Sequence, residues 1–172
     1  YFDEPNLVIL QRRMEALPSS EEKPKRLYFK TYLQLIRNSV GTEMFRNFYI
    51  QAADGAEMDA LSDGSNSCAF YVSSVLILFK KHSGVHGTVK STIDDLERSG
   101  WQRVDTATMQ AGDVIVWDAV ELEGAWYEHV GFYIGDGRGV STSWTEKKVV
   151  EHDVYFDGAR SIGQVFRHYE WD

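Results

Sequence analysis

The hydrophobic positions near the start of the chain recur at helical spacing. They do so within Pro5–Leu17 and again within Pro24–Asn38, where apolar residues return every three or four positions. A polar stretch separates the two segments, and Gly41 follows the second as a plausible stop signal. The pattern predicts an N-terminal helical extension over residues 1–41, packed as a hairpin on a main domain over residues 42–172.

The most apolar stretch of the chain lies within Ser62–Lys81. A loop-type sequence of Ser, Asp, Gly and Asn leads to Cys68, and Ala69–Phe79 is then apolar apart from two serines. A helix that is apolar around most of its circumference is normally buried, and Ser, Asn and Asp before it are N-cap residues. We therefore expect a central buried helix with Cys68 in its first turn, entered from a long loop over Ala52–Ser67. The preceding Thr42–Gln51 fits a helix or a strand.

The second half of the chain changes to strand patterns. Thr88–Ser99 predicts a short amphipathic helix that ends at Gly100. Apolar runs between turn residues then predict strands over Asp113–Asp118, His129–Ile134, Val140–Trp144, Lys148–Val154 and Gly163–Tyr169. Helices followed by antiparallel strands are typical of an α+β domain, and 172 residues suffice for one ordinary domain with a core.

Composition narrows the classes of partner. The chain has 18 basic and 26 acidic residues, a net charge of −8, and no basic stripe. We therefore expect neither nucleic acid nor an anionic membrane surface as a partner. No apolar run reaches the roughly 18 residues of a spanning helix. We expect a monomer without a membrane span.

The single cysteine, Cys68, has two interpretations. Free cysteine is often a small buried hydrophobe. In the first turn of a helix, however, unpaired N–H groups and the positive end of the helix dipole favour a thiolate. One cysteine forms no internal disulfide, so the compartment stays open. The chain begins at Tyr1 rather than Met, as a processed product does, so the missing signal peptide excludes no location.

His129 is the histidine that best complements Cys68. It begins a predicted strand whose other residues are apolar or glycine, so the strand can fix the ring at a cleft; the alternative is a histidine satisfied by a backbone carbonyl. Together the two residues form a thiol–imidazole pair, in which His takes the thiol proton and returns one to the leaving amine. His82 and His86 are four apart but flank Gly84, and no second cysteine supports zinc, so we expect neither a metal nor another cofactor.

Three segments resemble the NlpC/P60 family of cell-wall cysteine peptidases, which belongs to the papain-like group with the CHAP amidases. Ser67-Cys68-Ala-Phe is similar to the nucleophile motif Asp-Cys-Ser-Gly-Phe, and Ala111-Gly-Asp-Val-Ile-Val-Trp to the strand Pro-Gly-Asp-Leu-Val-Phe-Phe. His129-Val-Gly-Phe-Tyr-Ile-Gly-Asp-Gly resembles His-Val-Gly-Ile-Tyr-Ile-Gly-Asn-Gly, which begins with the catalytic His. The resemblance implies a papain-like fold, with the helix that carries the cysteine packed on an antiparallel sheet.

The resemblance also implies a third catalytic residue on the strand after His129. Counting through the Gly135–Gly139 turn gives Ser141, where the family has a His, Asn or Gln. A bridging water, Ser143 or His152 are alternative orienting groups. Tyr49 is the nearest match to an upstream tyrosine that lines the oxyanion site, with a place in the core as the alternative. Trp126 and Tyr127 are expected to line the cleft or to pack at a sheet end.

The expected function is hydrolysis of an amide bond in peptidoglycan stem peptides or another peptide or amide substrate. Cys68 would be the nucleophile, His129 the general base and acid, and Ser141 the orienting residue. This activity favours a secreted, periplasmic or cell-surface location over the cytoplasm. The departures at Ser67, Ala69-Phe70 and Ser141 leave two alternatives open: a binding or interaction module that has lost hydrolysis, and a thiol acyl or amide transferase.

Overall fold

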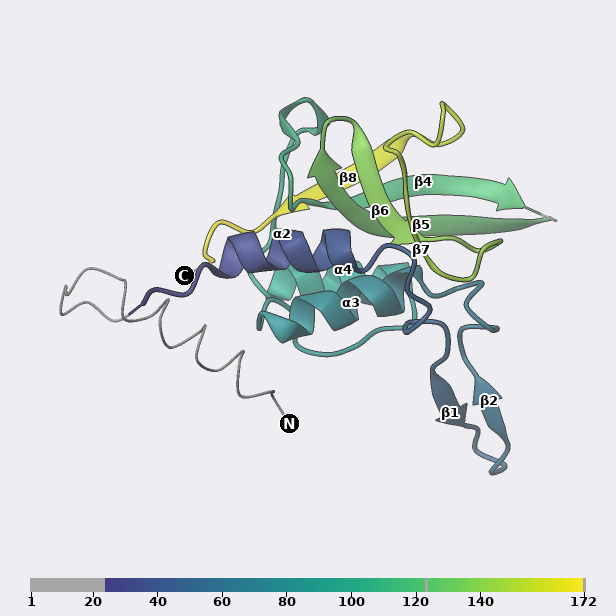
Figure 1. Cartoon of the computed structure of the whole chain (residues 1–172). Helices are drawn as coiled ribbons and strands as arrows, with labels where there is room; N and C mark the ends of the chain where they lie inside the picture. The colour runs from purple at the N-terminus through teal and green to yellow at the C-terminus, as the bar shows by residue number, and fades with distance from the viewer. Residues whose placement is uncertain (1–23, 123, 172) are drawn as a thin grey trace, which may run out of the picture.

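The chain is an α+β protein in which helices pack on a mostly antiparallel sheet (Figure 1). The structure, a computed structural model, describes residues 24–122 and 124–171. The α-helices in this part are α2 (Tyr28–Asn38), α3 (Cys68–Leu78) and α4 (Val89–Arg98). The helix predicted over Pro5–Leu17 lies outside the described residues. None of the described helices is long and apolar enough to cross a membrane.

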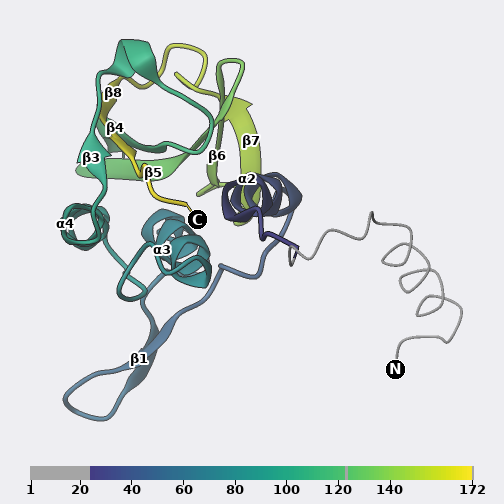
Figure 2. The same cartoon turned by 90° about the vertical axis from the view of Figure 1, so that its left-hand side faces the viewer.

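Six strands form the main sheet, in the order β3-β8-β4-β5-β6-β7. Their bounds are β3 (Gln102–Arg103), β4 (Val114–Leu122), β5 (Ala125–Gly135), β6 (Arg138–Thr142), β7 (Val149–Asp153) and β8 (Ile162–Arg167), and a 3-10 helix, η1 (Thr106–Thr108), precedes β4. All neighbouring strands of this sheet pair antiparallel. The sheet is strongly curved, and all three helices lie on one side of it (Figures 1 and 2). The strands predicted from the sequence are thereby confirmed, except that β4 ends four residues later and β5 begins four residues earlier than predicted.

The main core lies between the sheet and α3. Residues 69, 71, 72, 75 and 76 of α3 are buried, as its apolar composition predicts. Successive side chains of a strand point to opposite faces, so Val114 and Val116 of β4 enter this core. Ile115 and Trp117 belong to a second, smaller cluster on the other face. The second face matters because it carries the ring of Trp117 beside His129 (ring centroids 5.4 Å apart).

Helix α2 contributes to the same core as α3. Tyr32 is fully buried, stacks on Trp171 with ring centroids 4.3 Å apart, and donates its hydroxyl to the carbonyl of Gly112 at 2.9 Å. Ile36 is buried in the same cluster. The second predicted helix is therefore confirmed as a core element. The domain boundary at residue 41 stays a prediction.

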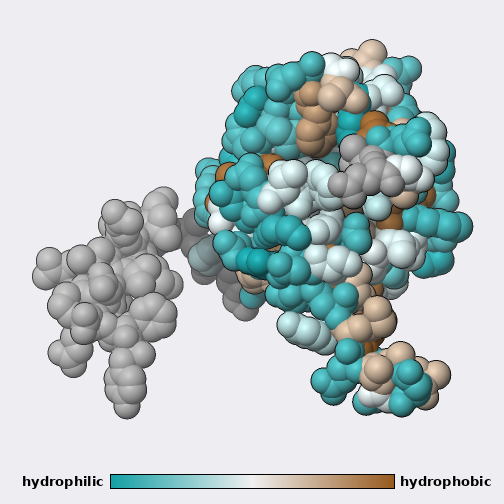
Figure 3. All heavy atoms as spheres, turned by 90° about the vertical axis from the view of Figure 1, so that its right-hand side faces the viewer, coloured by the Kyte–Doolittle hydropathy of each residue, from teal (hydrophilic) through white to brown (hydrophobic). Residues whose placement is uncertain are grey.

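The segment before α3 is more ordered than a long loop. Strands β1 (Tyr49–Gln51) and β2 (Glu57–Asp59) form a separate two-stranded hairpin that projects from the body (Figures 1 and 2). The carboxylate of Asp59 accepts the N–H groups of Phe48, Leu61 and Asp63, and these bonds hold its pKa well below the usual range. The hairpin also carries exposed apolar side chains, which Figure 3 shows among hydrophilic ones.

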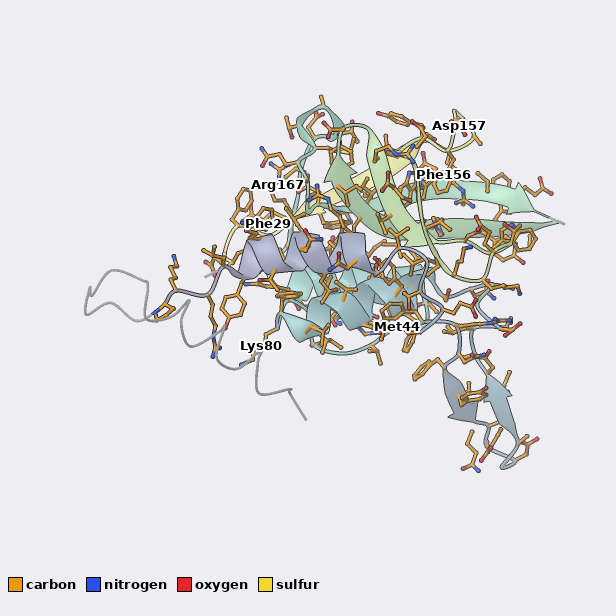
Figure 4. All side chains as sticks on the ribbon, in the orientation of Figure 1. Phe29, Met44, Lys80, Phe156, Asp157 and Arg167 are labelled. Carbon is orange, nitrogen blue, oxygen red and sulfur yellow. The ribbon has the colours of Figure 1, made fainter. Side chains whose placement is uncertain are left out.

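Asp113, the acidic residue of the Gly-Asp strand motif, has a structural role. Its carboxylate is 2% exposed and accepts two hydrogen bonds from Arg167, at 2.8 and 2.7 Å. This fork-shaped pair raises the pKa of Arg167 and joins the start of β4 to the end of β8. Figure 4 shows Arg167 near the end of α2 that carries Phe29.

Candidate active-site cleft

Cys68 and His129 line one cleft of about 1140 Å³. The start of α3 contributes Cys68 and Ala69, and β5 contributes Trp126 to His129. The other walls come from residues 87–90 before and in α4, from the β6–β7 turn, and from the loop between β7 and β8. The two residues that the sequence pairs lie 61 positions apart in the chain and are brought to the same surface.

Cys68 is the first residue of α3 and is partly buried. Ser67 precedes it as N-cap, but its hydroxyl donates to the carbonyl of Gly64 and does not cap the helix, contrary to the N-cap prediction. Burial raises the pKa of the Cys68 thiol above its ordinary value. The backbone N–H groups of Val130, Ala69 and Cys68, and the charge of Arg160, oppose that rise without cancelling it. In the free protein the thiol is therefore protonated, and the expected stabilised thiolate is not found.

Strand β5 meets the start of α3 at Val130, whose N–H is directed at the sulfur of Cys68. Val130 pairs with Val116 of β4, whereas the pairing of β5 with β6 begins at Phe132↔Val140. His129 lies within β5, which begins at Ala125, and does not begin the strand as predicted.

Ser141 lies beside His129, as the counting through the turn predicts. Its Oγ is 2.8 Å from Nε2 of His129 and 2.8 Å from Nε2 of His152. Nδ1 of His152 is 2.7 Å from the carbonyl of Asp153, which only accepts, so this nitrogen carries a proton. In neutral His152, Nε2 therefore accepts the Ser141 proton, and Oγ accepts one from His129.

This chain of hydrogen bonds fixes the tautomer of His129. Because Nε2 of His129 carries the proton, its Nδ1 keeps a lone pair and can act as a base. Ser141 is fully buried, so its single hydroxyl proton cannot hydrogen-bond to bulk water instead of to His152. His152, which the sequence offers as an alternative to Ser141, is the next member of the same chain of bonds.

A glycine allows the close approach of β5 and β6 at this site, and aromatic residues pack against the histidine rings. A Cβ on Gly131 would lie 2.6 Å from the carbonyl of Val140 and 2.8 Å from Cβ of Ser141, so only glycine permits this approach. Phe156 stacks on the ring of His152 at 3.9 Å and meets Trp117 at 5.2 Å. Figure 4 places Phe156 on the loop between β7 and β8. These contacts pack both imidazoles against aromatic neighbours on the wall of the cleft.

Desolvation, with smaller contributions from the charge of Arg160 and from the neighbouring His152, lowers the pKa of His129 from its usual 6.5 to about 3. Burial likewise lowers the pKa of His152. Both rings are therefore neutral at neutral pH. The resting pair is therefore a neutral thiol and a neutral imidazole.

Arg160 is the functional candidate that the sequence analysis missed. It lines the cleft from the β7–β8 loop, and its charge acts on both Cys68 and His129. Its position depends on a bulge in β4 between Trp117 and Val120, which no local sequence signal marks. A basic residue in a loop 92 positions after the cysteine gives no pattern that could have identified it.

Of the remaining sequence candidates, some line the cleft and Tyr49 does not. Trp126 and Tyr127 line the cleft and are largely exposed, as one of the two expectations for them states. Ser143 also lines it, but its hydroxyl bonds within its own turn, to Thr145 and to the N–H of Glu146. Tyr49 is 71% exposed on the β1–β2 hairpin and does not line the cleft, so both expectations for it are wrong.

His82 and His86 meet at a common partner despite Gly84 between them. Nδ1 of His82 and Nε2 of His86 lie 2.9 and 2.7 Å from one carboxylate oxygen of buried Asp95. The hydroxyl and N–H of Ser83 reach the same oxygen. The three ligand atoms lie within 4.8 Å of one another, but that oxygen already accepts hydrogen bonds from Ser83 and His86. The cluster fixes the segment that leads to residues 87–90 of the cleft, and the absence of a metal stays a prediction.

Comparison with known proteins assigns no family. No protein-family model matches the chain, and no curated protein matches it. The resemblance to the NlpC/P60 family therefore remains a prediction from the three quoted segments.

Proposed function

We propose that this chain is a cysteine hydrolase of the NlpC/P60 type, with a papain-like fold, that cleaves an amide bond in peptidoglycan stem peptides. The observation that carries the proposal is the chain of hydrogen bonds from His129 through Ser141 to His152, which leaves Nδ1 of His129 as a base. A cleft that holds the only thiol and an imidazole kept in one tautomer contains both the nucleophile and the base that acyl transfer uses.

The reaction follows from the neutral resting pair. Nδ1 of His129 takes the thiol proton as Sγ of Cys68 attacks the carbonyl carbon, and the charge passes to the carbonyl oxygen. The N–H of Cys68, in the first turn of α3, is a donor for that oxygen. His129 then gives the proton to the leaving amine, and the C–N bond breaks to leave a thioester. Water, deprotonated by His129, releases the acid and restores the thiol.

The raised pKa of Cys68 favours a second candidate, a binding module that keeps the cleft but has lost hydrolysis. The two differ in whether His129 activates the thiol when a substrate is bound. A transferase differs only in the acceptor, since an amine instead of water would attack the thioester.

Hydrolysis of purified muropeptides tests the proposal. We expect the wild type to release a new amine, and Cys68→Ala and His129→Ala each to abolish release while circular dichroism shows an intact fold. Full activity in Cys68→Ala would overturn the proposal, and no activity in the wild type would favour the binding module. An added amine that appears in the product would identify a transferase.

A further inference from the structure

The guanidinium of Arg160 is a cation without an acidic partner inside the cleft. Arg160 is partly buried, and among the described residues no carboxylate forms an ion pair with it. Burial lowers the pKa of Arg160, and Cys68 is the group that opposes this effect. Removing a charge from water costs free energy unless a partner compensates for it. A partly buried cation in the cleft without an acidic partner is therefore suited to bind an anionic group of the substrate.

The fold holds this guanidinium in place by one of its nitrogens. Nη1 donates to the carbonyl of Tyr127 at 3.1 Å and to that of Asp118 at 3.4 Å. The bulge in β4 frees the Asp118 carbonyl from the β5 ladder, and the N–H of Asp118 bonds to the carbonyl of Ser161. The ring of Phe156 lies below the guanidinium at 5.9 Å. Loop and sheet are thus joined around Arg160.

The other nitrogens of the guanidinium remain for a ligand. No hydrogen bond from Nε or Nη2 to a described residue accompanies the two bonds of Nη1. A carboxylate matches a guanidinium with two parallel N–H···O bonds, a geometry that lysine does not offer. Lys90 also lines the cleft, but its ammonium group forms an ion pair with Asp94, so it does not compete with Arg160 for a carboxylate.

We propose that Arg160 forms a carboxylate-binding subsite, which selects peptide substrates that carry a free carboxylate next to the scissile amide. The proposal rests on the proposed hydrolase function for its natural ligand, but not for its test. A bound carboxylate would also neutralise the charge that opposes protonation of His129, so an acidic substrate would strengthen the base that cleaves it. A substrate with a carboxamide in that place would gain neither effect.

Alkylation of Cys68 by two reagents of similar size tests the subsite. Iodoacetate carries a carboxylate and iodoacetamide does not, and both react with the same thiolate. Their rate ratio, divided by the ratio for free cysteine, therefore reports attraction of the anion independently of the thiol pKa. We expect a ratio about tenfold higher in the wild type than in Arg160→Gln, and an intermediate ratio in Arg160→Lys, which keeps the charge but not the two parallel bonds. Arg103→Gln, which removes an exposed and distant charge, is the matched control and should keep the wild-type ratio.

A second measurement needs no reaction at the thiol. Fluorescence of the cleft tryptophans Trp126 and Trp144 is titrated with N-acetylglycine and with its amide. We expect the acid to bind more tightly than the amide, and the difference to vanish in Arg160→Gln. Equal affinities, or an alkylation ratio unchanged in Arg160→Gln, would overturn the subsite even if the chain hydrolyses muropeptides. A subsite confirmed in a chain that hydrolyses nothing would instead leave the subsite standing and refute the proposed hydrolase.

Discussion

The hydroxyl of Ser141 lies 2.8 Å from Nε2 of His129, with the ring of His152 at the same distance on its other side. One proton on this hydroxyl therefore decides which nitrogen of His129 is free. A serine side chain is short and carries no charge, so alone it orients an imidazole less firmly than a carboxylate does. Because Ser141 donates its proton to His152, however, its oxygen is fixed as the acceptor for His129.

Ser141→Ala removes the hydroxyl and leaves Nε2 of His129 without a partner. We expect kcat on a muropeptide to fall by on the order of 100-fold with little change in KM, since the base loses its orientation and substrate contacts remain. Ser143→Ala is the control: its hydroxyl bonds within its own turn, so activity should change little. Equal losses in the two variants would refute the orienting role.

His152→Gln tests the outer member of the chain of bonds. A protonated His152 would donate to Ser141, turn the hydroxyl toward His129 and move the lone pair of His129 to Nε2. Burial, with a smaller contribution from Arg138, lowers the pKa of His152, while Asp153 and Glu151 act in the opposite direction. His152 therefore becomes protonated only at a pH below 6.5. A glutamine oxygen accepts the same bond without titrating. We expect activity at neutral pH to persist and the acid limb of kcat/KM to move to lower pH; an unmoved limb would contradict this.

The buried His129 should make the fold sensitive to acid. Its pKa is about 3 in the folded chain against 6.5 ordinarily, so between these values the unfolded chain binds more protons. Stability is therefore full above pH 6.5 and falls as the pH drops toward 3, by at most about 1.4 kcal/mol per pH unit from this residue. Urea unfolding at several pH values checks the slope, which His129→Gln should reduce. An equal slope in that variant would show that other groups cause it.

The ion pair of Asp113 and Arg167 should stabilise the fold without contributing to catalysis. Asp113→Ala leaves a buried guanidinium unpaired, and we expect a loss of about 3 to 5 kcal/mol in urea unfolding. Glu97→Ala breaks the exposed pair with Arg103 and should cost about 0 to 1 kcal/mol. Similar losses in both variants would contradict the structural role given to Asp113.

Much of the framework could be predicted because local patterns determine it. The apolar run after Cys68 required a buried helix, and the turn at Gly135–Gly139 fixed the count that leads to Ser141. The thiol pKa was not predictable, because the helix end favours a thiolate while tertiary burial disfavours it, and burial is the larger effect. Arg160 and the partnership of His152 with Ser141 depend on a bulge and on strand register, which arise only when distant segments pair.

Cys68 as the nucleophile is the claim on which the account depends. Intact-mass spectrometry of the chain, quenched in acid during turnover of a muropeptide, tests it directly. We predict a mass increase equal to the acyl part of the substrate, located on Cys68 and absent from Cys68→Ala, which should also release no amine. Amide cleavage that continues at the wild-type rate in Cys68→Ala, without any adduct on the wild type, would contradict the account.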